Sequence, residues 1–214
     1  MSAVAFHAGQ LARNLLAGVR LALFLPLRPE AFRVSPAHFG LLVLFNFAVW
    51  VGAAAARSGF EGEFDPSAIS VYLANVALVL ATALLVALAY RRPERLLLFA
   101  TALSASDALF DLTALAFVAA GVVDEHPTLF YVAYVAWAWI ASLRAAVVCG
   151  GWRGPGAYLA MLAVSAMTAL ALYVIPETEV WPLPDDEDEE PVHALLERGL
   201  FAERQPMDRP TGKP

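Results

Sequence analysis

The sequence predicts an all-α membrane protein, and three observations support this fold class. Hydrophobic residues make up 60% of the 214 residues and charged residues only 16%, unlike the more balanced composition of soluble domains. Five apolar segments follow one another, each long enough to cross a hydrocarbon layer of about 30 Å. A proline directly precedes or closely flanks the start of each segment, where its fixed φ suits the first turn of a helix. We therefore expect a five-transmembrane-helix bundle.

The composition divides the chain into three parts. Residues 1–33 form a basic, amphipathic arm, residues 34–176 the five-helix transmembrane domain, and residues 177–214 an acidic, proline-broken tail. The tail contains the acidic run Asp185–Glu190 and little apolar surface to bury, so we expect it to be largely disordered.

The pattern of apolar and polar residues in the arm predicts a helix that lies at the membrane interface. Its apolar stripe comprises Leu11, Leu15, Leu16, Val19, Ala22 and Leu23, and the opposite face carries Gln10, Arg13, Asn14 and Arg20. Such a helix is expected to lie among the headgroups of an anionic leaflet. A signal peptide is the alternative, but the run Leu21–Leu27 is short, contains Pro26 and is not followed by a small-residue cleavage site.

The five segments share one pattern at their starts. They are Ala37–Ala56, Ala68–Tyr90, Leu96–Val123, Thr128–Cys149 and Gly156–Ile175, introduced by Pro36, Pro66, Pro93, Pro127 and Pro155. Ser35 and Asp65 precede two of these prolines and suit helix N-caps. The fifth segment is rich in alanine, which permits close helix approach, so we expect it inside the bundle.

The distribution of arginine predicts the orientation. The arm and two alternate loops carry eight arginines, against Arg57 alone in the remaining loops; the eight are Arg13, Arg20, Arg28, Arg33, Arg91, Arg92, Arg95 and Arg153. Basic loops stay on the cytoplasmic side. We expect a cytoplasmic N-terminus and an extracytoplasmic C-terminal tail.

The third segment, Leu96–Val123, carries the main polar cluster: Ser104, Ser106, Asp107 and Asp111. Asp107 and Asp111 are four residues apart and share a helix face. Acids inside a membrane are costly, so the other four segments are expected to surround this one. One hypothesis makes the acids a proton or cation site, and the other makes them hydrogen-bonding groups that fix helix packing.

Three further polar residues lie within the spans. Arg144, in the fourth segment, is expected either to pair with Asp107 or to extend towards the inner headgroups. Asn46 and Asn75 are candidates for hydrogen bonds between helices.

The remaining polar residues and motifs do not favour the chemistry of a soluble enzyme. His7, His38, His126 and His193 are scattered along the chain, and Cys149 is the only cysteine. We find neither metal-ligand spacing nor a glycine-rich phosphate loop. We expect no enzymatic activity, metal, cofactor or nucleic-acid partner. The expected partners are the lipid bilayer and either a second copy of the chain or another membrane protein.

Four stretches resemble one group of bacterial membrane proteins: Arg13–Phe24, Ala31–Pro36, Phe64–Pro66 and the exit Ile175–Trp181. These proteins carry a legumain-like (caspase-clan) cysteine peptidase domain after a hydrophobic N-terminal region. The family's catalytic histidine lies in a His-Gly motif, and no histidine of this sequence precedes a glycine. The resemblance therefore implies a membrane anchor region, in the bacterial inner membrane, without the catalytic residues and shortened relative to the family.

Three functional hypotheses result. The first is a non-catalytic anchor or scaffold module, the second a small proton- or cation-coupled transporter or channel that uses Asp107 and Asp111. The third is a helical scaffold whose bundle resembles the Yip family of membrane-trafficking proteins. Carboxyls that control ion flux would distinguish the transporter from both scaffolds.

Overall fold

The computed structural model describes residues 3–57, 63–121, 127–151 and 154–174, and these residues form helices and their short connections. All belong to one compact unit, Met1–Pro182. The elements are α1 (Ala3–Ala22), η1 (Pro29–Ala31), α2 (Pro36–Arg57), α3 (Ser67–Ala89), η2 (Pro93–Arg95), α4 (Leu96–Ser104), α5 (Asp107–Ala119), α7 (Pro127–Gly150) and α8 (Pro155–Val174). The predicted acidic tail, residues 177–214, lies outside the described residues.

Five helices are long and apolar enough to cross a membrane, which makes the chain consistent with a multi-pass membrane protein. They are α2, α3, the combined η2–α4–α5 segment, α7 and α8. The predicted prolines stand at or next to their starts.

The two predicted caps form hydrogen bonds at helix starts. The backbone N–H of His38 donates to Ser35 Oγ over 3.1 Å, and that of Ser67 donates to Asp65 Oδ1 over 2.8 Å. The Ser67 side chain also donates to the Asp65 carboxylate. These bonds hold the pKa of Asp65 below its usual range.

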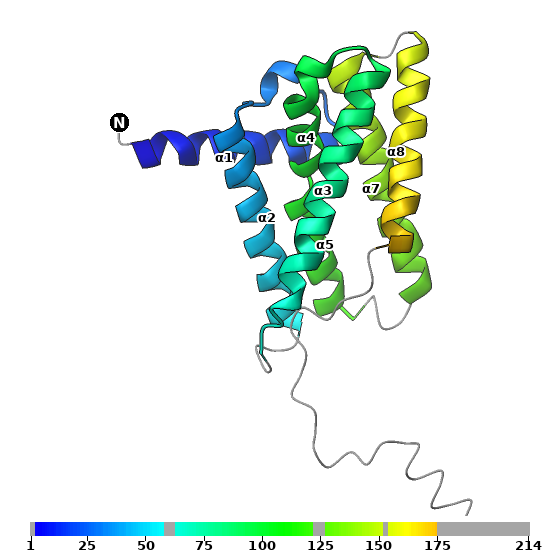
Figure 1. Cartoon of the computed structure of the whole chain (residues 1–214). Helices are drawn as coiled ribbons and strands as arrows, with labels where there is room; N and C mark the ends of the chain where they lie inside the picture. Colours follow the sequence, from blue (N-terminus) through cyan, green and yellow to red (C-terminus); the bar gives the residue numbers. More distant parts are fainter. Residues whose placement is uncertain (1–2, 58–62, 122–126, 152–153, 175–214) are drawn as a thin grey trace, which may run out of the picture. The chain divides into compact units, whose positions relative to one another are not determined.

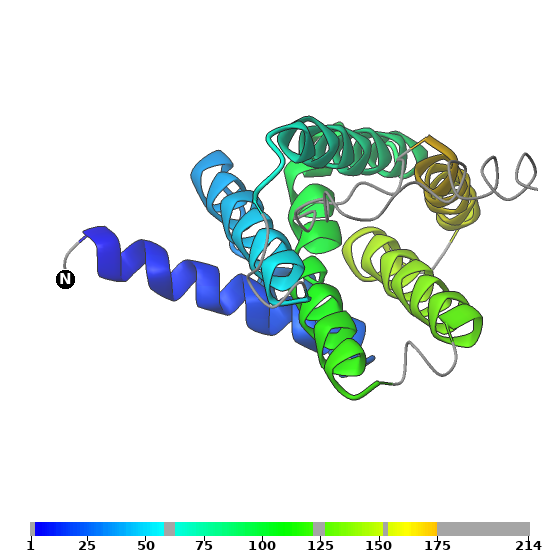
Figure 2. The same ribbon diagram turned by 90° about the horizontal axis from the view of Figure 1, so that it is seen from below.

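The prediction that the other four spans surround the segment formed by α4 and α5 is confirmed in part: α2, α3 and α7 pack on it, whereas α8 packs on α3 and α7. Helix α1 packs on the same segment as well (Figure 2). The α4 side chains Phe99, Ala100, Thr101 and Ala102 are buried.

The prediction that the alanine-rich fifth span lies inside the bundle is wrong. Helix α8 packs on α3 and α7 at the periphery. Ala157, Ala160 and Val164 face these neighbours and are buried, whereas Tyr158 and Leu162 are exposed. The small residues allow close approach on one face only, and the large apolar residues of the other face are suited to lipid.

The central span is not the continuous helix predicted for Leu96–Val123. Helix α4 ends at Ser104 and α5 begins at Asp107, with Ala105 and Ser106 in a turn between them. Helix α1 touches the chain at this turn: a Cβ added to Gly18 would lie 1.8 Å from the carbonyl oxygen of Ala105. Kinks form where another group presses into the hydrogen-bond ladder of a helix. The break therefore coincides with a close contact between helices.

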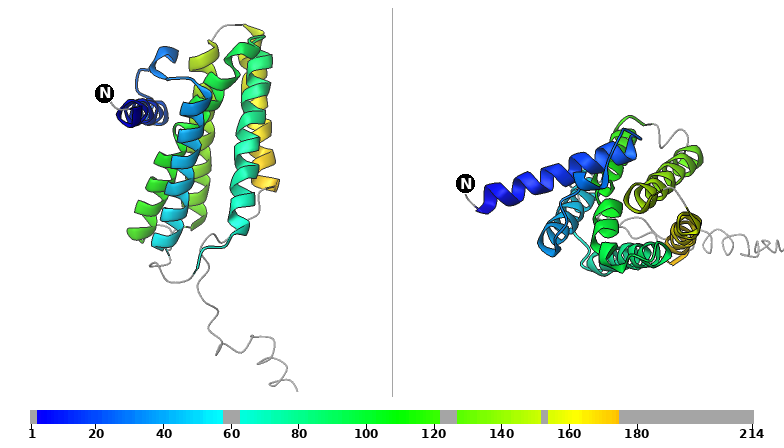
Figure 3. Two further views of the ribbon diagram at one scale, coloured as in Figure 1. Left: turned by 60° about the vertical axis from the view of Figure 1, so that its left-hand side comes forward. Right: turned by 90° about the horizontal axis from the view of Figure 1, so that it is seen from above.

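Helix α1 lies across the other helices (Figure 1), and the left view of Figure 3 shows it end-on while the spans run lengthwise. The prediction of a helix is confirmed, but the predicted division into two faces holds only in part. Leu11 and Leu15 of the apolar stripe pack against the core, and Arg13 of the polar face is exposed. Asn14, assigned to the polar face, is fully buried together with Ala17 and Leu21, whereas Leu16, assigned to the apolar face, is 55% exposed. The buried face contacts the bundle, so the exposed apolar residues are the ones available to lipid.

Asn14 tolerates burial because its amide is paired at both ends. Its Nδ2 donates to the Arg33 carbonyl over 3.0 Å, and its Oδ1 accepts from the Arg33 N–H over 2.7 Å. Polar groups are buried at low cost only when hydrogen-bonded. This bidentate contact fixes α1 to the chain that leads into α2.

Candidate functional site: a polar cavity at the break in the central span

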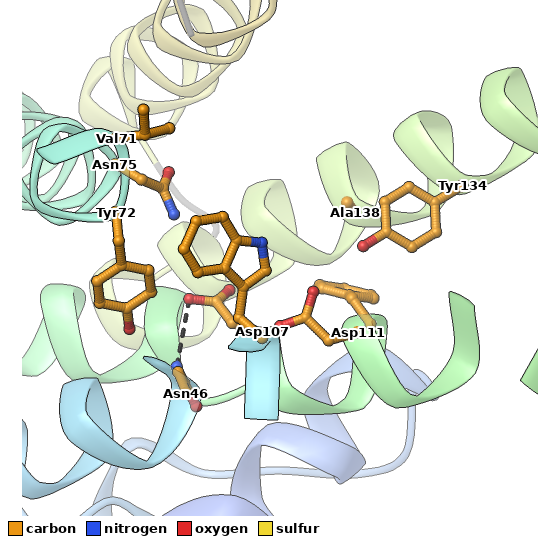
Figure 4. A pocket seen from close by; sticks show the side chains of 10 residues that line it. Asn46, Val71, Tyr72, Asn75, Asp107, Asp111, Tyr134 and Ala138 are labelled. Carbon is orange, nitrogen blue, oxygen red and sulfur yellow. Dashed lines mark hydrogen bonds between the residues drawn. The ribbon is translucent and has the colours of Figure 1, made fainter. Parts of the chain in front are cut away.

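A cavity of about 360 Å³ lies among α2, α3, α5 and α7 (Figure 4). Its walls combine carboxyl, amide and aromatic groups: Asn46, Trp50, Val71, Tyr72, Asn75, Asp107, Phe110, Asp111, Tyr134 and Ala138. The cavity begins just after the break, since Asp107 is the first residue of α5.

The two acids enter the cavity from one helix face. Asp107 and Asp111 are separated by one turn of α5, so their side chains emerge on the same side. Figure 4 shows both carboxyl groups at the cavity, with the Tyr134 hydroxyl directed towards Asp111. The prediction that the two acids share a helix face is confirmed.

Asn46 of α2 connects the two sides of the break. Its Nδ2 donates to the Ser104 carbonyl over 2.8 Å and lies 3.5 Å from Asp107 Oδ2. The first bond supplies a partner to a carbonyl that has none within α4, because the helix ends there. Asn46 is 3% exposed, and within the described part of the chain its Oδ1 has no hydrogen-bond partner.

Ser104, predicted as a site residue, takes part through its backbone. It is buried, its carbonyl binds Asn46, and it is not among the cavity-lining residues. Asn75, predicted to bond between helices, lines the cavity instead.

Aromatic rings form much of the remaining wall. The ring centroids of Tyr72 and Trp50 are 5.5 Å apart, and those of Phe110 and Tyr134 are 6.1 Å apart in an edge-to-face arrangement. The Tyr72 hydroxyl donates to the Val43 carbonyl over 2.7 Å, which fixes this ring between α2 and α3.

The sequence analysis did not assign these aromatic residues to the site. A signal was present, because Asn46 and Trp50 lie four residues apart and Tyr72 and Asn75 three apart. Such spacings place each pair on one helix face. They do not show that both faces turn towards Asp107.

Of the two alternatives weighed for Arg144, the pairing with Asp107 is wrong. The guanidinium of Arg144 donates to the carbonyls of Arg20, Leu21 and Leu25, at and just beyond the end of α1. Carbonyls at a helix C-terminus lack partners within the helix and attract cations. Arg144 therefore holds α1 in place.

Two of the histidines are closer than their scatter along the sequence suggests. The rings of His7 in α1 and His38 in α2 lie 5.6 Å apart between centroids. His126 and His193 lie outside the described residues. Among the residues with described placement, no group of three His, Cys, Asp or Glu side chains forms a metal-binding cluster.

Comparisons with protein-family models, with curated proteins and with solved structures found no match to this chain.

Proposed function

We propose that this protein moves protons or small cations across a membrane, with Asp107 and Asp111 as the ion-binding groups. The observation that carries the proposal is the position of both carboxyl groups in a cavity that begins at a helix break inside a candidate span. Broken helices provide such sites in transporters, because their free backbone groups and inward-facing polar side chains bind ions.

The physical argument concerns the free energy of placing a carboxyl group within a bilayer. A carboxyl within a bilayer is expensive, by about 2.5–3.5 kcal/mol on insertion scales, unless a partner or a water-filled cavity receives it. Here Asp107 and Asp111 both line a cavity. An ion or proton entering this cavity would offset the charge.

The orientation belongs to the same proposal. The eight-to-one distribution of arginine favours a cytoplasmic N-terminus and the bacterial inner membrane as the location. In this orientation the cavity lies on the extracytoplasmic side of the break between α4 and α5.

The second candidate is a non-catalytic anchor or scaffold, similar to the membrane region of legumain-like peptidases and shortened relative to them. The bridge made by Asn46 favours it, since one amide joins α2 to both α4 and α5. In this account the acids fix packing, and a second copy of the chain or another membrane protein is the expected partner.

Flux through proteoliposomes tests the first proposal. The wild-type protein should release an imposed proton or monovalent-cation gradient, and Asp107→Asn and Asp111→Asn should each abolish the release. Glu63→Gln, which changes an exposed acid outside the spans, is the matched control and should retain it. Equal flux in empty liposomes and in all protein samples would overturn transport and favour the scaffold.

A further inference from the structure

The cavity at the break has the chemistry of a site for an organic cation. Its lining includes two carboxyl groups and no lysine or arginine. A ligand of opposite charge is therefore the one favoured by the walls. When one of Asp107 and Asp111 is protonated, the pair carries a single negative charge. One singly charged cation then neutralises the pair without a second ion.

The aromatic walls distinguish an organic cation from a metal ion. Trp50, Tyr72, Phe110 and Tyr134 line the cavity along with the acids. Hard metal ions require six or more oxygen ligands at short distance. Aromatic faces instead attract ammonium-type cations, and Trp gives the strongest such contact.

The size of the cavity agrees with this ligand class. Its volume of about 360 Å³ is far larger than a bare ion needs and falls in the range of small-molecule pockets, roughly 300–1,000 Å³. Tyr72 is held in position by its bond to Val43, so part of the aromatic wall is formed before a ligand arrives.

Asn46 supplies a further polar contact. It lines the cavity, is almost completely buried, and its Oδ1 has no hydrogen-bond partner within the described residues. Buried polar atoms without partners carry a cost that a ligand can remove.

We infer that the cavity formed by Asp107, Asp111, Trp50 and Tyr72 binds a singly charged organic cation with an apolar or aromatic body. This inference rests on the proposed function and names the substrate class of the same site. The carboxyls supply the charge, and the rings enclose the substituents.

Equilibrium dialysis with tetraphenylphosphonium as the probe tests the inference on the purified, detergent-solubilised full chain. Wild-type protein should bind the probe saturably, and Na⁺ or K⁺ at equal concentration should not displace it. Asp107→Asn should weaken binding about tenfold or more through loss of the ionic contact. Trp50→Leu should weaken it about 2- to 30-fold, and Trp50→Phe, which keeps a ring, should weaken it less.

Trp139→Leu is the control, because Trp139 is a tryptophan of α7 that bonds to Ser165 and does not line the cavity. It should bind like wild type, which separates the cavity from adsorption to apolar surface. Absence of saturable binding by wild-type protein, or equal binding by Trp50→Leu and Trp139→Leu, would overturn the inference. Thermal unfolding of each variant without probe identifies any that fail to fold, and the wild-type result stands independently.

The outcomes for the two proposals are distinct. Asp107-dependent proton flux without probe binding would support transport and overturn the organic-cation site. Probe binding that requires Asp107 and Trp50, without flux of protons or of the probe, would support the site and overturn transport.

Discussion

Gly18 of α1 sets the contact between this helix and the break in the central span, and Gly18→Ala should disrupt it. The added Cβ would lie 1.8 Å from the Ala105 carbonyl oxygen and 2.2 Å from its carbonyl carbon. Real Cβ contacts are essentially never shorter than 3.0 Å, so α1 would have to retreat by about 1.2 Å. The opposing atoms belong to backbone and cannot rotate away.

The expected magnitude follows from two opposing terms. Alanine is favoured over glycine within a helix by about 1 kcal/mol. Overpacking of a close contact costs about 1–3 kcal/mol or more. A retreat of α1 would also strain the bonds from Arg144 to its C-terminal carbonyls. The first two terms leave a net loss of about 0–2 kcal/mol of stability, and the strain on the Arg144 bonds adds to it.

Gly9→Ala is the matched control in the same helix, because a Cβ at Gly9 would have nothing within 4 Å. It should keep or raise stability. Thermal unfolding of both variants in one detergent, with limited proteolysis of the arm as a readout of α1 docking, measures the difference. If Gly18→Ala is as stable and as protected as Gly9→Ala, the close contact with Ala105 does not exist.

Three further predictions concern the arm and the orientation. Arg144→Met should release α1 and lower stability by about 1–3 kcal/mol, since it removes the charge-assisted hydrogen bonds from the guanidinium to carbonyls at the end of α1, and Arg144→Lys should lower it less; a protected arm in Arg144→Met would contradict this. Asn14→Leu should lower the unfolding temperature because it removes two hydrogen bonds to the backbone, although leucine is the more apolar residue. An unchanged or higher unfolding temperature would refute the role of the amide. In a cysteine-free background and intact cells, a cysteine at Glu63 should react with an impermeant thiol reagent and one at Glu94 should not, and the reverse pattern would invert the proposed orientation.

The sequence predicted the five apolar helices well because their signals are local. Length, apolar composition and starting prolines each lie within the segment that they describe, and Ser35 and Asp65 bond only a few residues away. The shared face of Asp107 and Asp111 is equally local, since helical periodicity alone determines it.

The errors have one physical origin, which is contact between residues far apart in the chain. No proline or glycine marks the turn at Ala105, and the residue that approaches it closely, Gly18, lies in another helix. Asn14 is polar and yet buried, because Arg33 pairs with both ends of its amide. For Arg144 the sequence left open a pair with Asp107 or an extension towards the headgroups, whereas its guanidinium donates to carbonyls at the end of α1. Periodicity contains none of this information.

The central claim is that a polar, water-accessible cavity lies inside a membrane-spanning bundle, and cysteine accessibility tests it directly. Asn75 and Leu73 are close together in α3, but Asn75 lines the cavity whereas Leu73 is 58% exposed on the bundle surface. In membranes of a Cys149→Ala background, a cationic thiol reagent should modify Asn75→Cys and leave Leu73→Cys unmodified, because lipid covers the latter. Modification of both positions would contradict the membrane placement of α3, and modification of neither would contradict the cavity.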